Sequence, residues 1–189
     1  MAKAFKNTRR GITCELEKAE RDLLRGLFQD IITLLEPERT DDEDPLWALV
    51  GMDPNAHAEH FPVPRDRAEL RLLPDAVKGD AGASLEFRRL TERGLRERKV
   101  GGLRAAALAV ENSPLLLSPP AAAQFAAALN DVRLVLAERL GLETEDDAER
   151  IHDIDDWSQA DTVDEYLALV YNFVTWLQES LMQALLQTL

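Results

Sequence analysis

Apolar residues recur at steps of three and four positions through most of the chain, which is the spacing of one face of an α-helix. The first such segment runs from about residue 17 to residue 35, and Pro37 lies just beyond it, where helices commonly stop. Its apolar positions are Leu24, Leu27, Ile31, Leu34 and Leu35. The pattern therefore predicts an amphipathic helix near the start of the chain.

Two longer helices are predicted in the middle. One runs from about 83 to 110 and is interrupted by Gly94 and by the pair Gly101-Gly102. Each internal glycine costs about 1 kcal/mol against alanine, so a kink or a close helix–helix approach is expected there. The other opens at Ser118-Pro119-Pro120 and ends at Gly141, which are start and stop signals of a helix. Its apolar stripe is Phe125, Leu129, Val132, Leu136 and Leu140.

The last helix is predicted from about residue 162 to near the end of the chain, and it is apolar on most sides. A helix of that kind is usually buried. We therefore expect it at the centre, with the other helices packed around it.

Shorter elements complete the pattern. Residues 1–16 predict a β-hairpin, because Ile12, Cys14 and Leu16 alternate with polar residues after a polar turn that ends in Gly11. Short helices are predicted in PLWALVG (45–51) and RAELRLLP (67–74), with an irregular, proline-containing connection between them. Acidic loops are predicted at 36–45 and 143–161.

The predicted fold is mainly α: a single-domain helical bundle of residues 1–189 around a buried C-terminal helix, with a short N-terminal β-hairpin. The formal charge is -13, from 22 Lys+Arg against 35 Asp+Glu, and this disfavours binding of nucleic acid by the surface as a whole. A single cysteine excludes an intrachain disulfide. Without a signal-peptide pattern or a membrane span, the expected location is the cytoplasm.

The single cysteine, Cys14, is a redox candidate. Its thiol would be reactive if a cation lowered its pKa, and Arg9 and Arg10 lie close enough in sequence to do so across a turn. The alternative is that Cys14 is a small buried apolar side chain, as free cysteine usually is.

Other candidate chemistry is sparse. His57 and His60 are three residues apart but lack a clear third metal ligand, and His152 lies among aspartates without the spacing of a calcium-binding loop. The sequence contains no phosphate-binding glycine loop and no nucleophile elbow. We therefore expect no enzymatic activity, no metal and no cofactor.

A basic segment, LEFRRLTERGLRERKV (85–100), lies within this acidic chain. From residue 86 to residue 104 there are seven basic and three acidic residues, a local sum of +4. The segment is either a solvated or internally paired helix face, or a surface that docks a partner, since arginine is enriched at interfaces. The partner-binding candidates are Arg88, Arg89, Arg93, Arg96, Arg98 and Lys99.

Three stretches, EFRRLTERGLRERKV, ALNDVRLVLAERLGL and YNFVTWLQESLMQALL, together with the LLPDA turn at 72–76, resemble an actinobacterial family long catalogued as a domain of unknown function. Some members are named oxidative-stress regulators (the AosR family). The resemblance implies a small regulator that contacts the transcription machinery through a sigma factor. Members described as redox switches use two N-terminal cysteines, whereas this chain has only Cys14 there.

The expected function is therefore a non-enzymatic cytoplasmic regulatory protein that acts through protein–protein contacts in the oxidative-stress response. The alternatives are a thiol redox sensor that uses Cys14, which would require a sulfenic acid or an interchain disulfide, and a DNA-binding transcription regulator. Direct nucleic-acid binding is disfavoured by the charge, and a homodimer is a further expectation.

Overall fold

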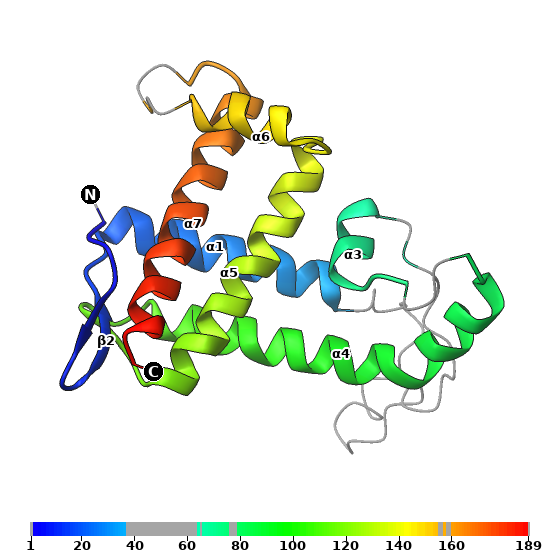
Figure 1. Cartoon of the computed structure of the whole chain (residues 1–189), viewed down its shortest axis with the longest axis horizontal. Helices are drawn as coiled ribbons and strands as arrows, with labels where there is room; N and C mark the ends of the chain where they lie inside the picture. Colours follow the sequence, from blue (N-terminus) through cyan, green and yellow to red (C-terminus); the bar gives the residue numbers. More distant parts are fainter. Residues whose placement is uncertain are drawn as a thin grey trace, which may run out of the picture.

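The structure is a computed structural model that describes residues 2–36, 64, 66–75, 79–154, 157 and 160–188. Helices dominate these residues, and a small antiparallel sheet lies at the N-terminal end (Figure 1). The predicted mainly helical class is thus confirmed. The predicted short helix at 45–51, His57, His60 and all but Glu36 of the predicted acidic loop at 36–45 lie outside the described residues.

The sheet contains the predicted hairpin and one additional strand. Strands β1 (Lys6–Thr8) and β2 (Gly11–Cys14) pair antiparallel, and β3 (Leu115–Leu117) adds to the other edge of β2, with Ile12 opposite Leu117. The sequence pattern did not indicate β3, because three residues are too few to show an alternation. Gly11 has a φ of 129°, and a Cβ atom there would lie 2.6 Å from the carbonyl oxygen of Leu117. Any other residue at position 11 would be strained by this backbone conformation and would clash with Leu117, so glycine is required there.

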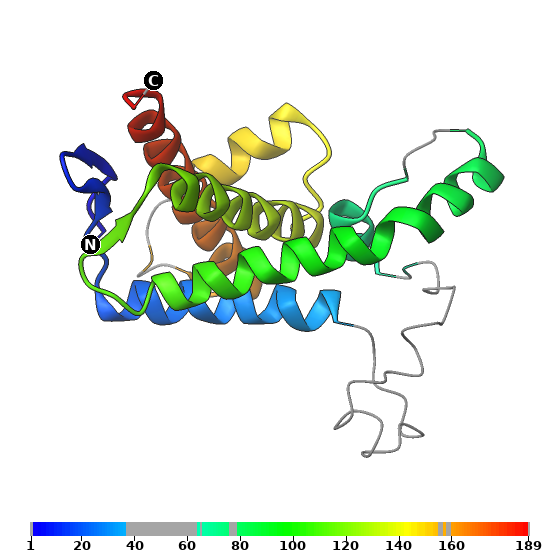
Figure 2. The same ribbon diagram turned by 90° about the horizontal axis from the view of Figure 1, so that it is seen from below.

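Helix α1 (Lys18–Leu35) confirms the first predicted helix. Its N-terminus carries a capping box, in which the Glu17 amide donates to Glu20 Oε2 at 2.8 Å. The helix packs along α4 (Ala81–Ala109), the long predicted helix of the middle region (Figure 2). The buried face of α1 consists of Leu24, Phe28, Ile31, Ile32 and Leu35.

Helix α5 (Pro119–Arg139) connects most of the other elements, because it contacts α1, α4, the C-terminal helix α7 (Val163–Leu186), the short helix α3 (Arg67–Leu72) and the sheet. As predicted, Ser118 caps its start and Gly141, with a φ of 66°, follows its end. Phe125 on α5 meets Phe5 and Phe28 edge-on, with ring centroids 6.2 Å and 5.7 Å apart. The hydrophobic core is therefore centred on α5, between the hairpin and α1.

Part of the predicted acidic loop at 143–161 is helical, so the loop prediction is wrong for helix α6 (Glu145–His152). Thr144 and Asp147 form a capping box, and the hydrogen bonds from Thr144 and from two backbone amides lower the pKa of Asp147 to about 2. Carboxylates stabilise the first turn of a helix, where the dipole is positive, so the charge density that suggested a loop here favours a helix start.

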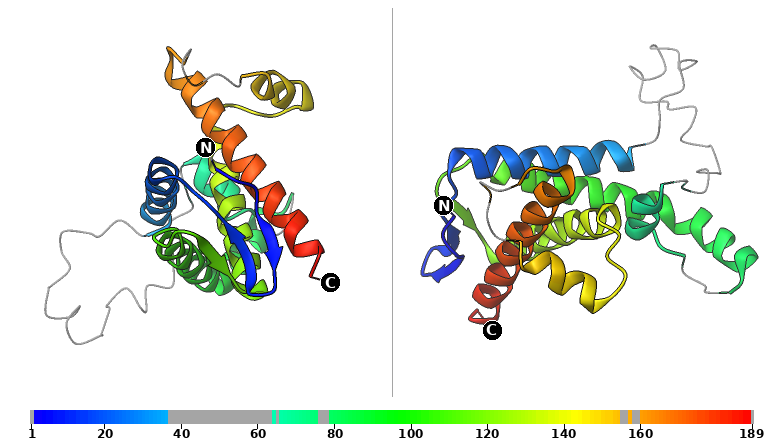
Figure 3. Two further views of the ribbon diagram at one scale, coloured as in Figure 1. Left: turned by 90° about the vertical axis from the view of Figure 1, so that its left-hand side faces the viewer. Right: turned by 90° about the horizontal axis from the view of Figure 1, so that it is seen from above.

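The C-terminal helix α7 (Val163–Leu186) packs on α5, α6 and the hairpin, as Figure 3 shows from two sides. The Phe5 amide donates to Ser180 Oγ at 3.4 Å and Asn7 Nδ2 donates to the carbonyl of Gln187 at 3.2 Å, which attaches the hairpin to its last turns. Its buried residues are Ala168, Leu169, Val170, Val174, Leu177, Ser180, Leu181 and Ala184. Within the described part of the chain, no helix has the length and apolar character needed to cross a membrane.

Candidate protein-interaction surfaces

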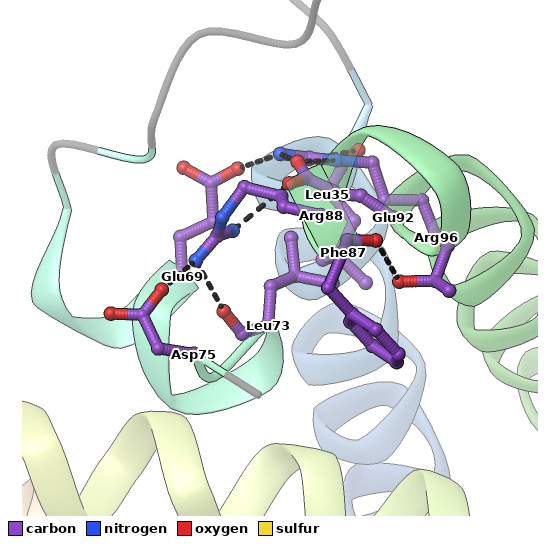
Figure 4. Close-up of polar contacts among 9 residues, drawn as sticks. Leu35, Glu69, Leu73, Asp75, Phe87, Arg88, Glu92 and Arg96 are labelled. Carbon is purple, nitrogen blue, oxygen red and sulfur yellow. Dashed lines mark hydrogen bonds and ion pairs between the residues drawn. The ribbon is translucent and has the colours of Figure 1, made fainter. Parts of the chain in front are cut away.

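A buried network of ion pairs occupies the inner side of α4 (Figure 4). Glu92 is 3% exposed, and its two carboxylate oxygens accept hydrogen bonds from Arg88 Nη1 at 2.9 Å and from Arg96 Nε and Nη2 at 2.9 and 2.7 Å. The three residues are four positions apart and therefore share one face of the helix. One carboxylate thus neutralises part of the charge of two buried guanidinium groups.

The guanidinium groups of Arg88 and Arg96 also donate hydrogen bonds to residues outside α4, and these bonds connect the helix to the rest of the fold. Arg88 Nη2 donates to the carbonyl of Leu73 at 3.2 Å and to Asp75 Oδ1 at 2.8 Å. The hydrogen bond from Arg88 is the main reason that the pKa of Asp75 is lowered. Arg96 Nη1 donates to the carbonyl of Leu35, the last residue of α1, at 2.9 Å. The network therefore joins α4 to the ends of α1 and α3.

Arg96 also reaches Glu69 on α3, with Nη2 2.5 Å from Glu69 Oε1. Because Arg88 and Arg96 are 8% and 7% exposed, a partner protein cannot reach their guanidinium groups in this fold. The prediction that the two residues dock a partner is thus wrong. The internally paired face, which the sequence left as the alternative, is what the structure shows for both of them.

The other basic candidates differ among themselves. Lys99 Nζ lies 2.6 Å from Asp131 Oδ1 on α5, and the pair is largely covered. Burial raises the pKa of Asp131, and the hydrogen bond from Lys99 opposes that rise. Arg93 is exposed and pairs with Glu97 one turn further on, while Arg98 is exposed on the same helix. The side chain of Arg89 lies outside the described residues. Lys99 is thus a structural residue, whereas Arg93 and Arg98 remain accessible.

Cys14 is 2% exposed, and its Sγ donates to the carbonyl of Lys3 at 3.0 Å. Burial, with smaller contributions from Glu20 and Glu15, raises the pKa of this thiol to about 12. The lowered pKa that Arg9 and Arg10 would have produced is therefore not found, because desolvation and two carboxylates raise the pKa of the thiol. The native thiol is protonated and covered.

We expect the thiol of native Cys14 to react about a thousandfold more slowly with a thiol reagent at pH 8 than the thiol of the unfolded chain. The reason is that a pKa of about 12 in place of 9.0 lowers the thiolate fraction by about three powers of ten, before burial is considered. Absorbance-detected labelling with and without denaturant measures the ratio. Equal rates would show that Cys14 is accessible and restore it as a redox candidate.

A groove of about 460 Å³ lies between α5, α6 and α7. Two of its polar residues bond within the fold: Asn172 Nδ2 donates to the carbonyls of Ile151 and Ile154 at 2.7 and 3.0 Å, and Arg133 Nη1 donates to Gln178 Oε1 at 2.8 Å. Arg133 Nε and Thr175 Oγ1 are buried there without a hydrogen-bond partner in the described part of the chain. Among the described residues, no group of three or more His, Cys, Asp and Glu side chains could hold a metal ion. The groove is lined by Arg133, Glu149, His152, Asp153, Tyr171, Asn172 and Thr175.

Helix α7 exposes several large apolar side chains, although its nearly continuous apolar sequence predicted a buried helix. Tyr166 and Trp176 are 46% and 40% exposed, and their rings contact those of Trp157 and Phe173, with centroids 5.8 and 6.4 Å apart. The continuous apolar sequence gave no signal that could separate the exposed side chains of this helix from the buried ones. The exposed large side chains of α7 are Val163, Tyr166, Trp176, Met182 and Leu186.

A second exposed face lies on α4. Phe87, Leu90 and Leu108 are 49%, 80% and 65% exposed, and Arg93 and Arg98 lie on the same outward half of the helix. Figure 2 shows α4 in front, with no helix or strand drawn over it. The basic segment therefore has a buried, paired side and an exposed side that combines apolar residues with arginine.

The fold and its surfaces define a class: an acidic, mainly helical protein with a buried ion-pair network and exposed large apolar side chains on α4 and α7. The chain belongs to the family described as Domain of unknown function (DUF2017), whose model matches residues 2–185. No curated protein and no solved structure matches the chain.

Proposed function

We propose that this protein is a non-enzymatic regulatory protein that acts through protein–protein contacts, with the exposed aromatic side chains of α7 as part of its partner-binding surface. The exposed Tyr166 and Trp176 carry this proposal, because aromatic side chains are enriched at protein interfaces and dominate their energetics. Without a partner that covers them, two large exposed aromatic rings on one helix would lower the solubility of the protein.

The charge of the C-terminal part of the chain indicates the chemistry of the partner. From residue 151 to the end of the chain there is no lysine or arginine, whereas Asp164 and Glu179 are exposed on α7 itself. An acidic surface of this kind attracts a basic partner and accelerates its association. We therefore propose a partner that presents apolar side chains within a basic surface.

The resemblance to the AosR regulators supplies a candidate. Protein regions that contact DNA are basic. A sigma factor contains such regions, and it is the partner that the resemblance implies. Binding of a sigma factor in the cytoplasm would place this protein in the oxidative-stress response, without direct contact to DNA and without chemistry at Cys14.

Capture of the host sigma factors by the tagged protein tests the proposal. We expect Trp176→Ser to reduce the captured amount by about tenfold or more, since a buried interface tryptophan is commonly a hot spot. The matched control is Leu116→Ser, which removes an exposed apolar side chain from β3, 52% exposed, and should leave capture unchanged. Raising the salt from about 0.1 to 0.5 M should weaken the complex.

Equal capture by Trp176→Ser and the parent, at equal thermal stability, would contradict this assignment of the surface. Binding of a promoter fragment by the purified protein alone at about 0.2 M salt would instead indicate direct DNA recognition.

A further inference from the structure

The groove between α5, α6 and α7 has a half-buried floor and an exposed rim. Arg133 on α5 and Thr175 on α7 are half-buried, whereas Glu149 and Asp153, in and just after α6, are exposed. Helix α6 packs against the N-terminal half of α7, at the end of the molecule farther from the hairpin (Figure 1). The volume of about 460 Å³ lies within the roughly 300–1,000 Å³ of pockets that hold small molecules.

The guanidinium group of Arg133 is held in place from two sides. Its Nη1 donates to Gln178 Oε1 at 2.8 Å, and Gln178 Nε2 in turn donates to the carbonyl of Ala126 at 3.2 Å. Its Cζ lies 5.7 Å from the centre of the Tyr171 ring, which is a cation–π distance. Arg133 Nε is buried and has no partner in the described chain. The Nε–Nη2 edge, by which arginine binds a carboxylate through two parallel hydrogen bonds, is therefore positioned but unused.

Arg133 differs from the other cations inside the fold because it lacks a carboxylate. Arg88, Arg96 and Lys99 each pair with one at 2.9 Å or less. Among the described residues, none forms an ion pair with Arg133, although the chain has 35 Asp+Glu against 22 Lys+Arg. Charges inside a protein are normally paired, so a half-buried guanidinium without a counter-charge favours an anionic group from outside the chain.

The hydroxyl of Thr175 is a second unused group at the floor. Its Oγ1 is buried and forms no hydrogen bond with the described residues. Buried polar atoms in native proteins are nearly always paired, so two unpaired ones in a single groove need a reason. A ligand carboxylate that accepts hydrogen bonds from Arg133 and Thr175 would pair both. Because both atoms are covered, binding requires small side-chain shifts at the floor, which are common when proteins bind a partner.

We propose that this groove binds a free amino acid. Its carboxylate pairs with Arg133 and Thr175, and an ammonium group of the ligand interacts with the carboxylates of Glu149 and Asp153. The rim argues for the ammonium group, because two exposed carboxylates would repel a ligand that carries only negative charge. The net charge of -13 opposes phosphate-rich ligands in the same way.

Thermal unfolding of the full chain with each standard amino acid tests the proposal, and calorimetry gives the Kd of those that bind. We expect at least one to raise the midpoint of unfolding by about 3 °C or more at about ten times its Kd. Arg133→Gln should weaken its binding about tenfold or more, because a charge-assisted pair of hydrogen bonds is lost. The matched control is Arg139→Gln on the same helix: Arg139 is exposed and pairs with Asp66 outside the groove, so the Kd should not change.

Thr175→Val distinguishes a hydroxyl that binds a ligand from one that serves the fold. The substitution keeps the shape of the side chain and removes a buried hydroxyl that the described chain leaves unpaired. The ligand-free protein should therefore be at least as stable as the parent, while the Kd should rise about threefold or more. Lower stability with an unchanged Kd would overturn the assignment of Thr175 to the site.

The rim is tested with analogues of the bound amino acid that lack an ammonium group. We expect such an analogue to bind the parent about fivefold more weakly or worse, and the double variant Glu149→Gln, Asp153→Asn to lose this preference. Binding of none of the amino acids, a Kd that Arg133→Gln does not change, or equal binding of the analogue would overturn the inference. The proposed function is judged separately, by the Trp176→Ser capture, because Trp176 does not line the groove.

Discussion

Replacement of Glu92 by glutamine is expected to lower the free energy of unfolding by about 3 kcal/mol, because removal of one member of a buried ion-pair group leaves uncompensated charge behind. Glu92 is 3% exposed and is the shared acceptor of Arg88 and Arg96. Glutamine keeps the size of the side chain but removes the negative charge between them. Two further carboxylates of the described chain, Asp75 and Glu69, reach Arg88 and Arg96 respectively.

Urea unfolding followed by circular dichroism measures this loss. The control is Glu97→Gln on the same helix, where the carboxylate is 71% exposed and pairs with Arg93 one turn earlier. Exposed pairs of this kind contribute at most about 0.5 kcal/mol. Similar stability losses for both variants would show that the Glu92 network is solvated and does not hold α4 to α1 and α3.

Replacement of Phe125 by alanine is expected to lower the free energy of unfolding by about 3–5 kcal/mol, which is typical when a buried phenylalanine is truncated. Phe125 is 2% exposed on α5 and contacts the rings of Phe5 and Phe28. The cavity would open between the hairpin, α1 and α5, which the phenylalanine cluster holds together.

Thermal or urea unfolding provides the measurement, with Leu116→Ala as the control. Leu116 is 52% exposed on β3, so its truncation removes little buried surface and should change stability by about 0.5 kcal/mol or less. A small effect of Phe125→Ala would mean that the neighbouring side chains collapse into the space, and that the hairpin is held chiefly by its backbone pairing.

The basic segment (85–100) shows what the spacing of residues can predict and what it cannot. The steps of four residues from Arg88 through Glu92 to Arg96 indicate that these side chains share a helix face, and the structure confirms this. Which way that face points depends on residues far away in the sequence. Arg96 is buried because Leu35 and Glu69 meet it from α1 and α3, and no local pattern contains that information.

The C-terminal helix α7 shows the same division between what the sequence indicates and what only the fold decides, here for apolar residues. Its boundaries follow from the sequence, because Thr162 and Glu165 form the capping box at its start. Its burial does not, because the sequence is apolar around nearly the whole helix. Leu177 is fully covered, whereas Trp176, the residue before it, is 40% exposed.

Cys14 is a third case, in which residues close to it in the sequence suggest a lowered thiol pKa that the fold does not produce. Arg9 and Arg10 are close along the chain, but the pairing of β2 with β3 and the contact with Lys3 cover the thiol. Its titration is then governed mainly by desolvation.

The sequence by itself determined the long helices and the N-terminal hairpin, because those features depend on interactions within a few residues and on the periodicity of apolar positions. It did not indicate α6 or β3. Only the tertiary structure decided which arginines are internal, which side of α7 is covered and whether the thiol is accessible. Each of these depends on which distant residues pack against a given face, and burial, unlike periodicity, is set by the packing of the whole chain.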